Sequence, residues 1–255
     1  LGVADAVVHL AGVNRPQDPA EFEVGNADLT RTIVDCLVER LQRESRPIPL
    51  VFASSTQAIL DNPYGRSKVR AEQGIMDMSS AHQIPSYIFR LDNVFGKWCR
   101  PNYNSVVATF CHNIARGLPI QIHDRHAPLR LVYVDDVVSA MIRALMVPHE
   151  LRCEGDFYQA GPVYELTVGT LADELKAYSE SRQTLITGNV GHGLSRALYS
   201  TYLSYLPSSE FSYPVPVHAD TRGVFVEMLK TPDAGQISFF TARPGVTRGG
   251  HYHHT

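Results

Sequence analysis

Short apolar runs alternate with amphipathic stretches through the first two thirds of the chain. The apolar runs predict strands over residues 6–10, 50–53 and 86–90. Apolar residues at helical spacing predict helices over about 21–44, 64–79, 104–116, 135–145 and 168–179. Strands that alternate with helices are typical of βαβ units, so the first part of the chain is expected to form a parallel sheet.

Helix signals support these boundaries. Gly117 follows the helix over 104–116 as a stop signal, and Thr167 is placed to cap the helix that follows it. We interpret Asp135 and Asp136 as a helix cap rather than a catalytic pair of carboxylates.

The pattern changes after about residue 200. Short alternating segments at 215–218, 224–229 and 236–241 are divided by Gly, Pro and Asp, which predicts antiparallel strands. The tyrosine-rich stretch 199–205 is interpreted as a connector between the two parts. The predicted fold is therefore α/β: a partial Rossmann-type, doubly wound parallel sheet in residues 1–205, then the start of an antiparallel β domain in residues 206–255.

The composition of the chain limits which partners it is expected to bind and indicates a cellular compartment. The formal net charge is −3 with no basic run, which argues against nucleic acid as a partner. No apolar stretch approaches the roughly 20 residues that a membrane-spanning helix needs, so no membrane insertion is expected. Four scattered cysteines suggest reduced, mostly buried thiols in a cytoplasmic protein. The abrupt ends predict that the sequence is an internal piece of a longer protein.

The spacing of Tyr64 and Lys68 carries the clearest chemistry. Four residues apart on a helix, the two side chains share one face. A phenol can act as an acid or base, and a nearby ammonium is expected to lower its pKa. Ser55, with Thr56 beside it, follows the strand over 50–53 and could hold a substrate oxygen.

Other strand ends point to the same edge of the sheet. His9, Leu10, Ala11 and Gly12 end the first strand with small residues, where a flat ligand can approach the backbone. Asn26 lies on the next helix and could hydrogen-bond backbone or water near that site.

Taken in order, these segments, with those around Asn93 and at 133–138, resemble the extended short-chain dehydrogenase/reductase superfamily of nucleotide-sugar epimerases, dehydratases and ketoreductases. The resemblance implies that a hydride passes between NAD(P) and a sugar carbon. It implies that Tyr64 and Lys68 are catalytic, with Ser55 and Thr56 holding the sugar oxygen. It places Asn93 and Arg90 on the substrate side. The implied cofactor-binding residues are His9, Leu10, Ala11, Gly12, Asn26, Tyr64 and Lys68.

Longer motifs are similar to one branch of that superfamily, the bifunctional capsular-polysaccharide F enzymes. They occupy residues 9–16, 61–68, 93–105 and 199–207. This resemblance implies a homodimer that uses NADPH, or NAD, to reduce a UDP-4-keto-6-deoxy-N-acetylhexosamine at C4. The product would be a precursor of UDP-N-acetyl-L-fucosamine.

The last part resembles the beginning of a sugar-nucleotide cupin. Residues 220–227 look like its first strand, and His251 and His253 match the first half of its metal motif. Alternate residues of a strand face one side, so both imidazoles could bind Zn²⁺ or another divalent ion. In the family resembled, the cupin epimerises the sugar at C3.

Two features depart from the superfamily pattern and leave alternatives open. No glycine-rich phosphate loop stands before the first strand of this sequence. Arg130 is out of register with an arginine that the superfamily often has before the segment that begins at Tyr133. An epimerase or dehydratase that retains NAD is one alternative. The other is a binding or assembly role without catalysis.

Overall fold

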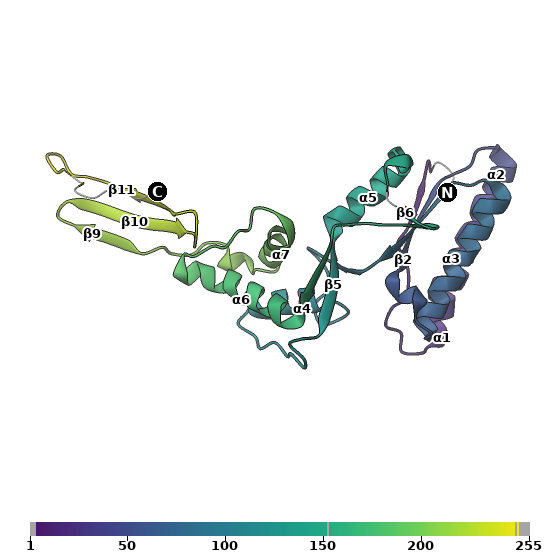
Figure 1. The fold of residues 1–255 in the computed structure, drawn as a ribbon, viewed down its shortest axis with the longest axis horizontal. Coiled ribbons are helices and arrows are strands. Elements are labelled where there is room, and N and C mark those ends of the chain that lie inside the picture. The colour runs from purple at the N-terminus through teal and green to yellow at the C-terminus, as the bar shows by residue number, and fades with distance from the viewer. Residues whose placement is uncertain (1–3, 152, 248, 250–255) are drawn as a thin grey trace. The chain divides into compact units, whose positions relative to one another are not determined.

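The computed structural model describes residues 4–151, 153–247 and 249. The chain divides into two compact units, and each is described by itself. The first unit is Leu1–Phe95 with Pro128–Leu166, and the second is Gly96–Ala127 with Thr167–Thr255. Figure 1 shows the elements of both along the chain.

A five-stranded sheet forms the centre of the first unit. Its order is β1 (Val7–His9), β2 (Leu50–Ser55), β3 (Ser86–Leu91), β7 (Phe157–Tyr158) and β6 (Cys153–Glu154). The first four strands run parallel, and β6 pairs with β7 in the antiparallel sense. The predicted α/β class with a parallel, Rossmann-like sheet is confirmed.

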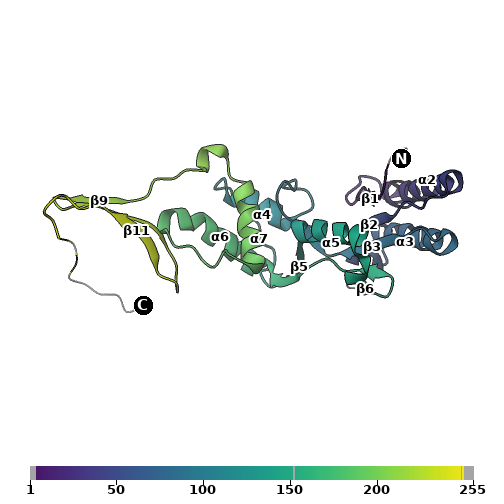
Figure 2. The ribbon, with the colours of Figure 1, turned by 90° about the horizontal axis from the view of Figure 1, so that it is seen from above.

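Helices cover both faces of this sheet (Figures 1 and 2). On one side the chain forms α1 (Ala20–Phe22), the π-helical segment η1 (Glu23–Asp28), α2 (Leu29–Glu44) and α3 (Pro63–His82). The other side carries α5 (Val134–Met146), followed by the short 3₁₀ segment η3 (Pro148–Glu150). Another 3₁₀ segment, η2 (Thr56–Ile59), joins β2 to α3.

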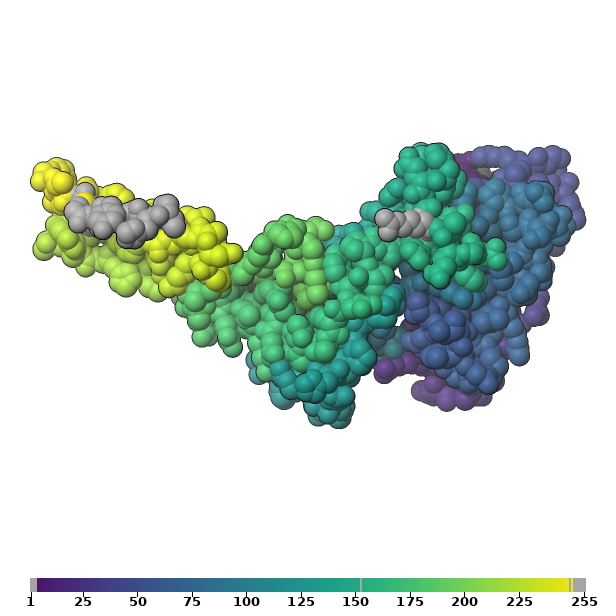
Figure 3. Space-filling model, viewed as in Figure 1, coloured from purple at the N-terminus to yellow at the C-terminus, as the bar shows by residue number. Residues whose placement is uncertain are grey.

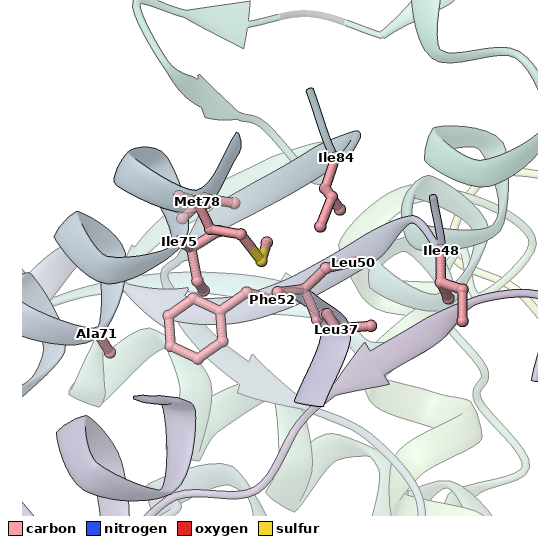
Figure 4. Close-up of a cluster of buried hydrophobic side chains, with 9 residues drawn as sticks. Leu37, Ile48, Leu50, Phe52, Ala71, Ile75, Met78 and Ile84 are labelled. Atoms are coloured by element: carbon pink, nitrogen blue, oxygen red, sulfur yellow. The ribbon is translucent and has the colours of Figure 1, made fainter. Parts of the chain in front are cut away.

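Alternate residues of β2 supply two separate cores. Leu50 and Phe52 pack with Leu37 of α2 and Ile75 of α3, as Figure 4 shows. Val51 packs on the opposite face in the cluster that contains residues of α5. A strand buried on both faces explains why β2 is apolar without alternation.

A smaller sheet completes the first unit, in the order β4 (Asn93–Phe95), β5 (Pro128–Tyr133) and β8 (Val163–Thr167). We did not predict it as a sheet. Helix α5 follows β5 directly with Tyr133 as its N-cap residue, and the Tyr133 side chain makes no capping hydrogen bond. Asp135 and Asp136 therefore lie in the first turn rather than at the cap, where their charges suit the helix dipole.

In the described residues of the second unit, the chain forms three α-helices and an antiparallel sheet. The helices are α4 (Val106–Ile114), α6 (Val168–Thr184) and α7 (Gly193–Ser204), followed by the 3₁₀ segment η4 (Ser208–Glu210). Thr167 caps α6 as predicted, by accepting a hydrogen bond from the backbone of Thr170. The stretch predicted as a connector is mostly helical, because α7 continues to Ser204.

The sheet has the order β11 (Gln236–Phe240), β10 (Gly223–Lys230), β9 (Val217–Asp220), and its strands are antiparallel as predicted. Its side chains form much of the yellow-green surface in Figure 3. The domain boundary at residues 205/206 stays a prediction.

The cysteines are less buried than we expected. Cys111 is buried, Cys99 is intermediate, and Cys36 and Cys153 are exposed; all four are free thiols. Among the described residues, no helix is both long and apolar enough to cross a membrane.

Candidate active site

Tyr64 lies in the first turn of α3, where the local sequence fixes the start of the helix. Asn62 caps the helix by accepting a hydrogen bond from the Gly65 amide at 2.8 Å, and Pro63 occupies the first position. The Tyr64 ring is half-buried and packs against Phe22, with 5.6 Å between ring centroids.

The phenol of Tyr64 is paired with Ser55 at the end of β2. Burial raises the pKa of Tyr64, and the hydrogen bond with Ser55 lowers that pKa in part. We expected the ammonium of Lys68 to lower the pKa of Tyr64 below its usual range. The structure gives the opposite direction, because desolvation outweighs the interactions that favour the phenolate.

Lys68 is one helical turn beyond Tyr64 and is only 5% exposed. Its Nζ donates to the Ala53 carbonyl at 3.0 Å and lies 4.8 Å from the centroid of the Phe52 ring. Burial lowers the pKa of Lys68 to about 8, while the carboxylate of Glu72 acts to raise it. The ammonium therefore loses its proton at a lower pH than an ordinary lysine does.

His9 is buried at the end of β1 and serves the structure of this edge. Its Nε2 lies 2.9 Å from Thr30 Oγ1, and its ring is 5.1 Å from that of Phe52. Burial, reinforced by the positive charge of Lys68, lowers the pKa of His9 to about 4. The imidazole is consequently neutral at physiological pH.

Asn26 clamps the loop that follows β1. Its Oδ1 accepts from the Val13 amide at 2.8 Å, and its Nδ2 donates to the Val13 carbonyl at 3.0 Å and to Ser67 Oγ at 2.9 Å. The side chain is 1% exposed, so the amide is buried and satisfied by protein groups. Asn26 thus joins η1, the loop and α3, the first of our two expected roles for it.

The edge formed by residues 10–12 suits the approach of a flat ligand. Leu10, Ala11 and Gly12 are all exposed. A Cβ at Gly12 would lie 2.8 Å from Asn26 Oδ1 and 3.4 Å from Lys68 Nζ, so only glycine leaves this space open. Lys68 has three donors, and among the described residues the Ala53 carbonyl is its one hydrogen-bond acceptor. These features fit the nicotinamide-ribose end of a dinucleotide.

The two residues predicted on the substrate side have protein partners. Arg90 donates from Nε and Nη2 to the two carboxylate oxygens of Glu72, at 3.0 and 2.7 Å, and its guanidinium lies 3.5 Å from the Phe157 ring centroid. Asn93 is exposed on β4, and its Nδ2 donates to the Arg130 carbonyl at 3.1 Å. The bidentate fork of Arg90 is thereby used within the protein.

The first unit contains a cavity of about 1390 Å³ that Arg90 helps to line. Its lining includes Thr56, Arg90, Asp92 and Arg130, whereas Ser55, Tyr64 and Lys68 are not among its lining residues. Arg130, whose role the sequence left open, pairs with Asp92 at 3.0 Å and with Glu165. Thr56 also donates to the Leu91 carbonyl at 3.4 Å.

The sequence interpretation missed four buried polar residues in this region: Thr30, Ser54, Ser67 and Glu72. Glu72 could have been found from its position, since it follows Lys68 by four residues and so shares the face that carries Tyr64 and Lys68. Ser54 and Ser67 carry no signal of that kind.

The predicted metal ligands His251 and His253 lie outside the described residues. Within the described part of the chain, no group of three or more His, Cys, Asp or Glu side chains could hold a metal ion.

Comparison with known proteins gives two family matches. The model described as the NAD dependent epimerase/dehydratase family matches residues 3–159, and the one described as the polysaccharide biosynthesis C-terminal domain matches residues 218–255. A curated relative from Pseudomonas aeruginosa is named UDP-2-acetamido-2,6-beta-L-arabino-hexul-4-ose reductase. It is 54% identical over 251 residues, which are 98% of this chain and 66% of the relative.

Solved structures agree on the fold. The capsular polysaccharide assembling protein CapF from Staphylococcus aureus is 43% identical with a TM-score of 0.86, over 99% of this chain and 67% of that one. The Bordetella bronchiseptica enzyme WbmF, solved in complex with NAD⁺, is 19% identical with a TM-score of 0.62, over 78% and 71% of the two chains. At that identity the second match supports the fold alone.

Proposed function

The chain belongs to the NAD dependent epimerase/dehydratase family, and we propose that the protein reduces a UDP-4-keto-6-deoxy-N-acetylhexosamine at C4 with NADPH. The curated relative, of which this chain spans 66%, is named for a UDP-linked 2-acetamido sugar with a carbonyl at C4. The single observation that carries the proposal is the Ser55–Tyr64 contact with Lys68 buried one turn further along α3. It joins an acid, a hydroxyl and an ammonium at one strand end.

Each of these side chains has a task in carbonyl reduction. Because burial raises the pKa of Tyr64, the phenol keeps its proton until the alkoxide at C4 can accept it. Ser55 holds the same sugar oxygen through its hydroxyl. NADPH supplies the hydride when it is bound, and the exposed backbone at residues 10–12, with Lys68, would hold its ribose.

The remaining parts of the proposal concern the whole protein. We propose that the segment from residue 206 begins a cupin, in which His251 and His253 bind Zn²⁺ or another divalent ion and the sugar is epimerised at C3. We also propose that the enzyme is a cytoplasmic homodimer in capsule or O-antigen synthesis. The match of residues 218–255 to a polysaccharide biosynthesis domain supports the part of this proposal that concerns polysaccharide synthesis.

Replacing the acid tests the proposal directly. In the full-length protein, Tyr64→Phe should reduce NADPH oxidation with the 4-keto sugar by about 10²- to 10⁴-fold, because it removes the proton donor. Exchange at C3 should continue in the same variant, which shows that the cupin is intact, and an unchanged thermal unfolding transition controls for folding of the unit that carries Tyr64. Tyr87→Phe changes another half-buried tyrosine of the same unit and should retain the wild-type rate.

Unchanged NADPH oxidation in Tyr64→Phe would contradict the proposal. The two alternatives have their own outcomes. Turnover without net consumption of NADPH indicates an epimerase or dehydratase that retains NAD. Failure of the full-length protein to bind NADPH in a titration indicates a role without this catalysis.

A further inference from the structure

Helix α3 holds the end of strand β2 at three consecutive residues. Tyr64 hydrogen-bonds with Ser55, Lys68 donates to the Ala53 carbonyl, and Glu72 accepts from Ser54 Oγ. The three helix residues are spaced by four and so lie along one face. Two of these contacts belong to the proposed active site, and Glu72 makes the third.

Glu72 is the most deeply placed charge in this group, at 1% exposure. Its carboxylate accepts the Ser54 hydroxyl and both arms of the Arg90 guanidinium. Arg90 in turn lies over the ring of Phe157 on β7. One carboxylate therefore connects α3 with β2 and β3 directly, and with β7 through Arg90.

Stability alone does not require such a pair. Replacing a buried ion pair by well-packed apolar residues is often neutral or stabilising, whereas removing one partner is costly. What a buried carboxylate does supply here is fixed geometry and a negative charge one turn from Lys68. The geometry affects how Ser55, Tyr64 and Lys68 are placed, and the negative charge affects the protonation of Lys68.

We propose that Glu72 is a positioning residue, which fixes the register between β2 and α3 so that Ser55, Tyr64 and Lys68 meet, and which supplies the counter-charge for the Lys68 ammonium. The inference rests on the proposed function. Besides Glu72, His9 on β1 interacts electrostatically with Lys68, and Tyr64 lies one turn away on the same helix. Arg90 on β3 pairs with Glu72 itself.

In the full-length protein, Glu72→Gln removes the negative charge of the side chain while it keeps nearly the same size and shape. The amide keeps an acceptor for Ser54 but loses the charge that supports the Lys68 ammonium. We expect kcat to fall about tenfold or more, with KM for the UDP-sugar changed less than about twofold. The alkaline limb of the pH–rate profile should move to lower pH by about one unit, because Lys68 then loses its proton more readily.

Glu23→Gln is the matched control. Glu23 also forms an ion pair with α3, to Arg70 at 2.6 Å, but both side chains are substantially exposed. The same chemical change there should alter neither kcat nor the pH profile. An equal effect in both variants would overturn the proposal.

Glu72→Gln leaves Arg90 without its charged partner and could therefore destabilise the protein. A second variant distinguishes this loss of stability from the effect on Lys68. Glu72→Gln/Arg90→Gln removes both charges and should recover thermal stability while it retains the alkaline shift. If the double variant is folded and the alkaline limb of its pH–rate profile lies at the wild-type pH, the proposal is overturned.

Titration of Lys68 by NMR, with ¹³C-labelled lysine and Lys68→Arg for assignment, needs no turnover. If the wild-type protein lacked reductase activity, this titration would still test Glu72. A Lys68 titration that is the same in wild type and Glu72→Gln would overturn the inference whatever the reaction is.

Discussion

The two sheets at opposite ends of the sequence are stabilised in different ways. In β2 of the first unit, Leu50, Val51 and Phe52 are each at most 1% exposed, because helices cover both faces. In the antiparallel sheet of the second unit, every residue of β9 and β11 is exposed. The first sheet is thus held by its cores, whereas in the described part of the second sheet Val226 of β10 is the buried hydrophobic residue.

Burial also decides where chemistry can develop. Among the described residues, the buried polar side chains all belong to the first unit except Thr201. A charged or polar group that loses water responds strongly to each neighbour, which is why His9, Tyr64 and Lys68 have shifted pKa values. The exposed strands of the other sheet leave their polar groups in water. The comparison supports the proposal that the reactive site lies at the covered sheet.

The largest effect on stability should come from an isoleucine in the first core. Ile75→Ala removes a fully buried side chain and should lower the free energy of unfolding by about 2–5 kcal/mol. Ile237→Ala, at a site that is 60% exposed on β11, should change it by less than about 0.5 kcal/mol. Denaturation in urea measures both. If both variants lost the same free energy of unfolding, the proposed difference between the two sheets would be wrong.

A pH dependence should follow from the buried imidazole of His9. The pKa of His9 is about 4 in the folded chain, against an ordinary value of 6.5. Between these values the unfolded chain binds the proton and the folded chain does not. The contribution of His9 to stability is therefore constant above pH 6.5 and falls by up to about 3 kcal/mol as the pH drops to 4.

Unfolding free energies measured at several pH values test this dependence. In His9→Gln, which retains a polar partner for Thr30, the decline between pH 6.5 and 4 should become shallower. An unchanged slope in the variant would show that the imidazole titrates normally, against the burial argument.

The smallest effects on stability are expected at two glycines, Gly12 in a crowded site and Gly235 in an open turn. Gly12→Ala places a methyl group 2.8 Å from Asn26 Oδ1, which should cost about 1–3 kcal/mol and weaken NADPH binding. Gly235, in the turn between β10 and β11, has φ +87° with open space around it, so Gly235→Ala should cost about 1 kcal/mol through backbone strain alone. Thermal unfolding and NADPH titration of both variants distinguish crowding at the site from local strain.

Local patterns allowed much of the fold to be predicted. Apolar runs marked β1, β2 and β3, and helical spacing marked α2, α3 and α6. Strands β6 and β7, with two residues each, carry too little periodic signal, so the edge of the larger sheet was missed. The smaller sheet was missed because the pairing of β4, β5 and β8 depends on contacts between distant segments. The sequence placed Tyr64 and Lys68 on one helical face but did not reveal the partners of Arg90 and Asn26.

Local patterns were enough to predict most of the alternation of strands and helices and the shared helical face of Tyr64 and Lys68, because both depend on residues that are close in sequence. The packed structure was needed to show that Arg90 pairs with Glu72, that Asn26 binds the backbone of Val13, and that burial raises the pKa of Tyr64. These outcomes depend on groups brought together from distant segments and on the water removed when they meet. Pairing and desolvation are properties of the packed chain, and no local spacing encodes them.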